Sequence, residues 1–120
     1  MEYLLAIIGP FFLLLIESLL PYPYIVEEIF KFFLAKSTTS IKTAIVLGLL
    51  FSLSEAFFYL MNPVYVLSPM YFVLRLTAVS AMHITTILIM QYFLKRKNLW
   101  PIGLFLSILI HYLFNLFGGL

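Results

Sequence analysis

The chain contains no cysteine and, among its five acidic residues, no aspartate. Without cysteine, the protein cannot use thiol catalysis, disulfide bonds or cysteine-based metal sites. Every side-chain carboxylate is therefore a glutamate, and any acid–base or metal chemistry of a carboxylate falls on Glu2, Glu17, Glu27, Glu28 or Glu55.

Charge of either sign is also scarce. Only 10% of the 120 residues are charged, whereas 64% are hydrophobic. A soluble domain of this length needs more polar surface than this composition provides. The length suits one domain, residues 1–120, and a net charge of +2 gives no argument for nucleic acid as a partner. We therefore expect a single integral membrane domain that lies in the lipid bilayer.

Apolar runs, separated by prolines, tyrosines and polar loops, divide the chain into about five segments. A helix rises about 1.5 Å per residue and a hydrocarbon core is about 30 Å thick, so most of these runs are long enough to cross it. The second run is short and charged, and we expect the other helices to surround it. The predicted fold is an all-α, polytopic membrane helix bundle with a polar intramembrane cluster and about five transmembrane helices, near residues 3–20, 24–35, 41–61, 70–94 and 99–117.

The basic residues predict how the bundle is oriented. Five of the seven lie in two loops, residues 36–42 and 95–97, which two predicted crossings separate, so both loops lie on one side. The positive-inside rule makes this side cytoplasmic. The connections near residues 21–24 and 62–69 contain no Lys or Arg. We expect a multi-pass protein of the cell membrane with a cytoplasmic N-terminus and a C-terminus outside.

The most unusual stretch of the chain is residues 27–31. Three of these five residues are charged, although the segment lies in an otherwise apolar predicted helix. Insertion scales put each charge at about 2.5–3.5 kcal/mol at the centre of a membrane helix. At helical spacing Glu27, Glu28 and Lys31 share one face. Adjacent carboxylates can serve as a water-activating base and its helper. The alternative is a structural ion pair, and we expect Lys31 to balance charge rather than act as a nucleophile.

Other polar side chains fall at a similar depth in the predicted helices. Counted from the nearest basic loop, Glu28, Glu55, His83 and His111 lie about 12 to 20 Å deep. They come from four different helices, which predicts one polar cluster. His83 and His111 can each be a base, an acid or a metal ligand, or simply a packed and hydrogen-bonded histidine.

Further residues are candidates for supporting this cluster. Glu55 and Tyr59 are four residues apart and can present together, and Glu55 is either functional or a protonated structural group. We expect Arg75 to pair with a Glu, with part of its side chain reaching the interface. Asn115, four residues after His111, can orient a substrate carbonyl or stabilise an oxyanion, or form an interhelical hydrogen bond.

In this order, these residues resemble the PrsW family of intramembrane proteases, within the superfamily of CAAX-processing and bacteriocin-processing proteases. The resemblance covers about residues 27–115. The chain departs from the family in having Ala56 after Glu55, where PrsW-like proteins usually have Asn, and in having fewer helices. The matching elements are Glu27-Glu28-x-x-Lys31, Phe51-x-x-x-Glu55 with Tyr59, Arg75 with His83, and His111-x-x-x-Asn115.

The resemblance implies hydrolysis of a peptide bond of a membrane-bound protein or peptide. It implies that Glu27, Glu28 and His83 activate the water, and that His111 and Asn115 stabilise the tetrahedral intermediate. Family members have been described both as metalloproteases and as glutamate-dependent proteases. His83, His111 and Glu28 could hold a zinc ion. The same residues could also catalyse hydrolysis as general bases without a metal.

Two other functions stay open at this point. The chain could be a catalytically inactive scaffold or assembly subunit of a membrane complex, which keeps the polar cluster for structure. It could also be a small proton-coupled transporter subunit with a proton-relaying chain of Glu and His. A scaffold should tolerate Glu27→Gln, whereas a proton carrier should tolerate Asn115→Ala and show pH-linked flux. Oligomerisation is compatible with all three functions.

Overall fold

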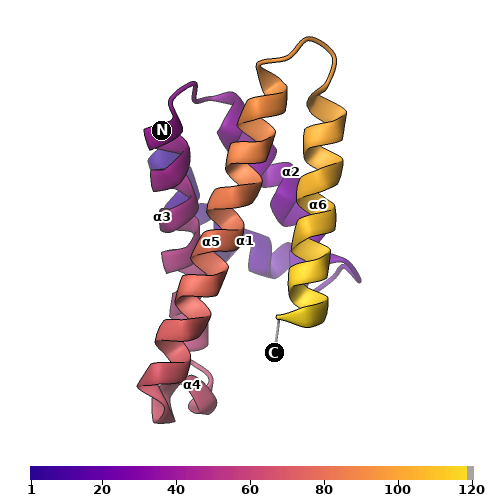
Figure 1. The fold of residues 1–120 in the computed structure, drawn as a ribbon. Helices are drawn as coiled ribbons and strands as arrows, with labels where there is room; N and C mark the ends of the chain where they lie inside the picture. The colour runs from indigo at the N-terminus through magenta and orange to yellow at the C-terminus, as the bar shows by residue number, and fades with distance from the viewer. Residues whose placement is uncertain (119–120) are drawn as a thin grey trace.

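The computed structural model describes residues 1–118, apart from the side chains of Glu17 and Val64. All regular secondary structure in this part of the chain is α-helical, which confirms the predicted class. Six helices follow one another along the chain and are shown in Figure 1: α1 (Glu2–Glu17), α2 (Pro23–Lys36), α3 (Ile41–Tyr59), α4 (Pro63–Leu67), α5 (Pro69–Leu94) and α6 (Trp100–Phe117).

Prolines mark the beginnings of several helices. Pro23, Pro69 and Pro101 lie in the first turns of α2, α5 and α6, where a missing N–H removes no intrahelical hydrogen bond. Helix α1 ends at Glu17, three residues before its predicted end, and the predicted connection at 62–69 contains the short helix α4. The other predicted helix ends differ from the observed ones by two residues or fewer.

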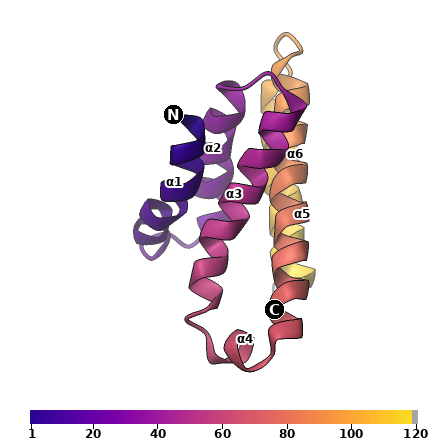
Figure 2. The ribbon, with the colours of Figure 1, turned by 90° about the vertical axis from the view of Figure 1, so that its left-hand side faces the viewer.

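Three of these helices, α3, α5 and α6, are long and apolar enough to cross a membrane, which indicates a membrane protein. Helices α1 and α2 have 16 and 14 residues, or about 24 and 21 Å at about 1.5 Å per residue. Both are shorter than a hydrocarbon core of about 30 Å. Length and composition therefore support three of the five predicted spans. In Figure 2, the connection between α1 and α2 lies well short of the end of the bundle that carries α4.

The helices pack so that one face of α2 is covered by its neighbours. Helix α3 lies against α5, and α5 lies against α6, while α1 packs on α3. Helix α2 contacts α1, α5 and α6 and buries Glu28 and Lys31, but Ile29 and Phe33 remain exposed, so the other helices surround it only in part. Figures 1 and 2 place the N-terminus and the α2–α3 and α5–α6 connections at one end of the bundle, and α4 at the other. The two basic loops therefore share one end.

Buried apolar residues close the bundle on the side of these basic loops. Leu34 and Ala35 of α2, Leu47 of α3, and Ile87 and Met90 of α5 belong to one core cluster. On α2 and α5 these residues lie between the basic loop and the charged residues of the same helix. The core therefore separates the charged residues of the bundle from the end that carries the basic loops.

A glycine allows α3 and α5 to approach closely beside the buried charges. A Cβ atom on Gly48 would lie 2.8 Å from Cα of Ile84 and 2.9 Å from its backbone nitrogen. Such short distances to backbone leave no room for a side chain. Small residues permit this approach at helix interfaces in membranes, and here the approach helps to bring Glu55 of α3 and His83 of α5 together.

Candidate active site

Six titratable side chains meet inside the bundle, and we call them the polar cluster. They come from α2, α3, α5 and α6, as the similar predicted depths suggest. Glu28, Lys31 and His83 are completely buried, whereas the side chains of Glu27 and Glu55 remain 14% and 18% exposed. The polar cluster consists of Glu27, Glu28, Lys31, Glu55, His83 and His111.

Lys31 lies at the centre of the buried part of the polar cluster. Its ammonium group forms a close ion pair with the carboxylate of Glu28, one helical turn earlier on α2. Its Nζ atom also lies 2.9 Å from Nδ1 of His83 and 3.1 Å from Oγ1 of Thr86, both on α5. A buried ion pair is stable only when its remaining donors and acceptors are hydrogen-bonded, and α5 supplies these partners.

Both histidines connect carboxylates to this centre. Nδ1 of His111 lies 2.7 Å from Oε1 of Glu28, and its Nε2 lies 3.6 Å from Oε2 of Glu27. Nε2 of His83 lies 3.0 Å from Oε2 of Glu55. The contacts therefore form one continuous path through all six side chains, which runs Glu27, His111, Glu28, Lys31, His83 and Glu55.

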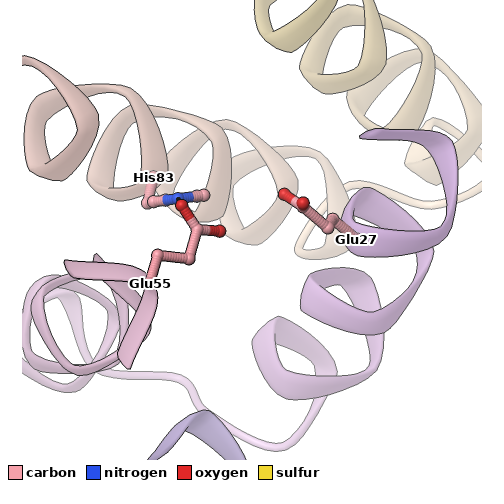
Figure 3. A group of neighbouring side chains, drawn as sticks. All are labelled: Glu27, Glu55 and His83. Atoms are coloured by element: carbon pink, nitrogen blue, oxygen red, sulfur yellow. Dashed lines mark ion pairs between the residues drawn. The ribbon is translucent and has the colours of Figure 1, made fainter. Parts of the chain in front are cut away.

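The two ends of this path come close together beside a cavity. Figure 3 shows Glu27 reaching from α2 toward Glu55 of α3 and His83 of α5. The cavity has a volume of about 150 Å³, and Glu27, Glu55 and Tyr59 form its polar end. An apolar cavity of about this volume can hold a group the size of an aromatic ring. Its remaining lining residues are Pro10, Leu13, Leu14, Phe51 and Phe58.

Tyr59 and Arg75 lie at the edge of the polar cluster. The hydroxyl of Tyr59 lies 3.4 Å from Oε2 of Glu55. Arg75 donates a hydrogen bond of 2.7 Å to the carbonyl of Gly118, and its guanidinium lies over the rings of Tyr59 and Phe114. These contacts of Arg75 go to a backbone carbonyl and to aromatic rings, and its predicted pairing with a Glu stays a prediction. Arg75 precedes His83 on α5 by eight residues, or about 12 Å along the helix. Its guanidinium therefore lies away from His83 and against the rings of Tyr59 and Phe114.

The predicted site residue Asn115 is not among the residues that the structure brings together. It lies one turn beyond His111 on α6, and its side chain is exposed. The contacts of His111 within the polar cluster go to Glu28 and Glu27. A contact between Asn115 and a reaction intermediate therefore stays a prediction.

Thr86 is a member of the site that the sequence patterns did not single out. It is completely buried, accepts a hydrogen bond from Lys31, and donates one of 3.1 Å to the backbone carbonyl of His83. Ser107 of α6 in turn donates to the backbone carbonyl of Thr86. Spacing in the sequence could have identified Thr86, because it follows His83 by three residues and so shares its helix face.

Whether a metal ion fits depends on the nitrogen atoms of His83. One ligand atom each from Glu27, Glu55 and His83 lies within 4.8 Å of the others, and of the predicted zinc ligands only His83 belongs to this group. A histidine ligand must offer an unprotonated nitrogen. Nδ1 of His83 lies 2.9 Å from the Lys31 ammonium, so Nε2, the nitrogen closest to Glu55, would be the ligand atom of a site shared with Glu27 and Glu55.

Comparisons of this chain with protein-family models, with curated protein sequences and with solved structures find no match. The functional argument therefore depends on the geometry of the polar cluster and of the cavity beside it.

Proposed function

We propose that the protein is an intramembrane protease, which hydrolyses a peptide bond of a membrane-bound protein or peptide. The observation that carries this proposal is the position of Glu27 and Glu55 at the polar end of an otherwise apolar cavity. A purely structural ion-pair network has no need of a cavity at its carboxylates. A hydrolase for an apolar peptide needs a space of this kind, in which acid–base groups meet an apolar side chain of the substrate.

In the proposed reaction, Glu27 is the general base. A water molecule loses one proton to the Glu27 carboxylate while its oxygen forms a bond to the substrate carbonyl carbon. The carbonyl oxygen becomes an oxyanion, which a nearby N–H or O–H donor stabilises. The C–N bond then breaks as Glu27 returns the proton to the leaving nitrogen, so that the products are a carboxylic acid and an amine.

The surroundings of Glu27 support this role better than those of Glu28. Glu28 is completely buried and its Oε1 atom already contacts Lys31 and His111. Glu27 is partly exposed and lines the cavity. A group that exchanges a proton with a substrate must be within hydrogen-bond reach of it. Glu27 therefore meets this requirement, and Glu28 is better placed to orient His111.

We also propose that α1, α2, α3, α5 and α6 all lie in the membrane, with the N-terminus cytoplasmic and the C-terminus outside. The common end of the two basic loops and the N-terminus supports this orientation. Because α1 and α2 are shorter than a hydrocarbon core, their connection would lie below the membrane surface, on the side away from the basic loops. Such a connection is tolerated where it is covered by protein or reached by water.

The proposed activity is tested in cells that produce the wild type, Glu27→Gln or Glu2→Gln. Mass spectrometry is used to search for new protein termini inside or beside membrane spans. We expect Glu27→Gln to lower the yield of such termini by about 100-fold or more, because general-base catalysis contributes about 10²–10⁴ in rate. Glu2→Gln is the matched control, since Glu2 lies at the start of α1, next to the N-terminal amine.

Equal yields of new termini from Glu27→Gln and the wild type would contradict the proposed activity. If Glu27→Gln inserts to the level of the wild type and both chains give the same termini, this chain does not hydrolyse membrane proteins by itself. An assembly subunit that keeps the polar cluster for structure would then be the better proposal.

A further inference from the structure

The hydrogen bonds of Lys31 determine where the protons of the polar cluster lie. A lysine ammonium has three N–H donors and no acceptor, and an ionised carboxylate only accepts. Lys31 has three neighbours at hydrogen-bond distance: the Glu28 carboxylate, Nδ1 of His83 and Oγ1 of Thr86. Because Thr86 gives its own hydroxyl hydrogen to the carbonyl of His83, its oxygen accepts from Lys31. All three hydrogens of Lys31 are thereby used.

The two histidines then carry their ring protons on different nitrogens. Nδ1 of His83 accepts from Lys31, so a neutral His83 has its proton on Nε2, 3.0 Å from Glu55. Nδ1 of His111 faces Glu28 at 2.7 Å and must donate to this carboxylate. A neutral His111 therefore has its lone pair on Nε2. We infer that Lys31 and Glu28 hold His83 and His111 in opposite tautomers.

Opposite tautomers assign different tasks to the two histidines, and this part of the inference rests on the proposed function. Nε2 of His111 and Oε2 of Glu27 are both acceptors, 3.6 Å apart. Two acceptors that face each other at this distance can be joined through the hydrogens of a water molecule. A water that gives its hydrogens to Glu27 and His111 directs its oxygen lone pairs away from them, toward a substrate carbonyl carbon.

His83 takes a different task. Its Nε2–H faces the Glu55 carboxylate at 3.0 Å, and Glu55 lines the cavity. The completely buried His83 ring therefore positions this carboxylate beside the cavity and does not itself reach the substrate. The resemblance implied that His83 helps to activate the water and that His111 stabilises the intermediate. The tautomers instead assign the water to His111 and the positioning of Glu55 to His83, and Lys31 and Glu28 become positioning residues that act through the rings.

Nitrogen NMR tests the tautomers without any need for a substrate. His83 and His111 are the only histidines in the chain, so ¹⁵N-labelled histidine reports on these two rings alone when the purification tag contains no histidine. The protein is reconstituted in phospholipid nanodiscs, and His83→Gln and His111→Gln assign the signals. We expect a protonated Nε2 and an unprotonated Nδ1 for His83, and the reverse for His111. The same tautomer on both rings, or the reversed pair, would overturn the inference.

Variants of Lys31 test the cause of this arrangement. Lys31→Met removes the donor to His83, so we expect the His83 ring to lose its single tautomer while His111 keeps its proton on Nδ1. The arginine of Lys31→Arg, like lysine, can donate hydrogen bonds but not accept them. This variant should therefore preserve the wild-type signals. Lys36→Met is the matched control, since Lys36 is on the same helix but exposed, and should change neither ring.

The outcomes separate the inference from the proposed function. A folded Lys31→Met protein with an unchanged His83 ring would overturn the role of Lys31. If Lys31→Met does not fold, the histidine signals of the wild type and of Lys31→Arg decide whether the two rings have the inferred tautomers. None of these measurements requires cleavage, so a failed search for new protein termini would contradict the protease proposal and leave the tautomers to be decided by NMR.

Discussion

Lys31 shows, at the scale of a single residue, how a charge is accommodated in an apolar bundle. It is among the largest of the completely buried side chains, and it contacts partners on α2 and α5. Burying a charge is costly unless the charge is paired and hydrogen-bonded. The structure meets both conditions for Lys31, so the stability of the bundle should depend strongly on this side chain.

Lys31→Met should therefore destabilise the protein. Removing one partner of a buried ion pair typically costs about 3–5 kcal/mol, because the other charge is left without compensation. We expect a loss of this size in the free energy of unfolding, measured by denaturant titration of the protein in detergent micelles. Lys36→Met, at the exposed end of α2, should change it by less than about 0.5 kcal/mol.

A double variant shows whether the loss comes from Glu28. Glu28→Gln combined with Lys31→Met removes both charges of the pair, so we expect it to be more stable than Lys31→Met alone. A double variant as unstable as the sum of its two single variants would contradict a direct coupling between these side chains.

At the scale of helices, the contact between α3 and α5 depends on a missing side chain. A Cβ atom at Gly48 would meet the backbone of Ile84 at 2.8 Å, and backbone cannot turn aside as a side chain can. The same contact brings Glu55 of α3 to His83 of α5. Any separation of these helices should therefore disturb both packing and the polar cluster.

Gly48→Ala should destabilise the bundle by about 1–3 kcal/mol, which is typical of overpacking in a well-packed interior. Gly9→Ala is the matched control, because a Cβ atom at Gly9 would meet the outer end of the Phe30 ring, which can swing away. Unfolding free energies in the same detergent compare the two variants. Equal losses for both would contradict the close approach of α3 and α5.

The molecule carries five of its seven basic residues at one end, and this predicts its orientation. Because the chain has no cysteine, single cysteines at exposed positions can report the side of the membrane. We expect Thr39→Cys and Leu99→Cys, next to the basic residues of the two loops, to be protected from a membrane-impermeant maleimide in intact cells. Ser68→Cys, beside α4, should be labelled.

Permeabilised cells provide the control for accessibility, since all three cysteines should then react. Labelling of Thr39→Cys and Leu99→Cys but not of Ser68→Cys in intact cells would reverse the proposed orientation. Labelling of all three from outside would contradict the pair of crossings, α3 and α5, between Thr39 and Leu99.

Much of the fold follows from local properties of the sequence. Apolar composition and the positions of prolines predict the helices, because hydrogen bonds within one helix satisfy its backbone without help from other parts of the chain. Spacing along each helix also predicts the ion pair of Glu28 with Lys31 and the contact of Glu55 with Tyr59. The sequence does not determine whether α1 and α2 cross the membrane, since both helices are shorter than the hydrocarbon core.

The sequence by itself therefore determined the helical class, the gathering of the basic residues in two loops, and the similar depth of the residues that form the polar cluster. Only the tertiary structure decided which atoms meet: His111 with Glu28, His83 with Lys31 and Glu55, Arg75 with the carbonyl of Gly118, and Asn115 away from the carboxylates. The physical reason is that depth depends on distance along one helix. Contacts between helices depend on how each helix is rotated about its axis, and the packing of all side chains together sets that rotation.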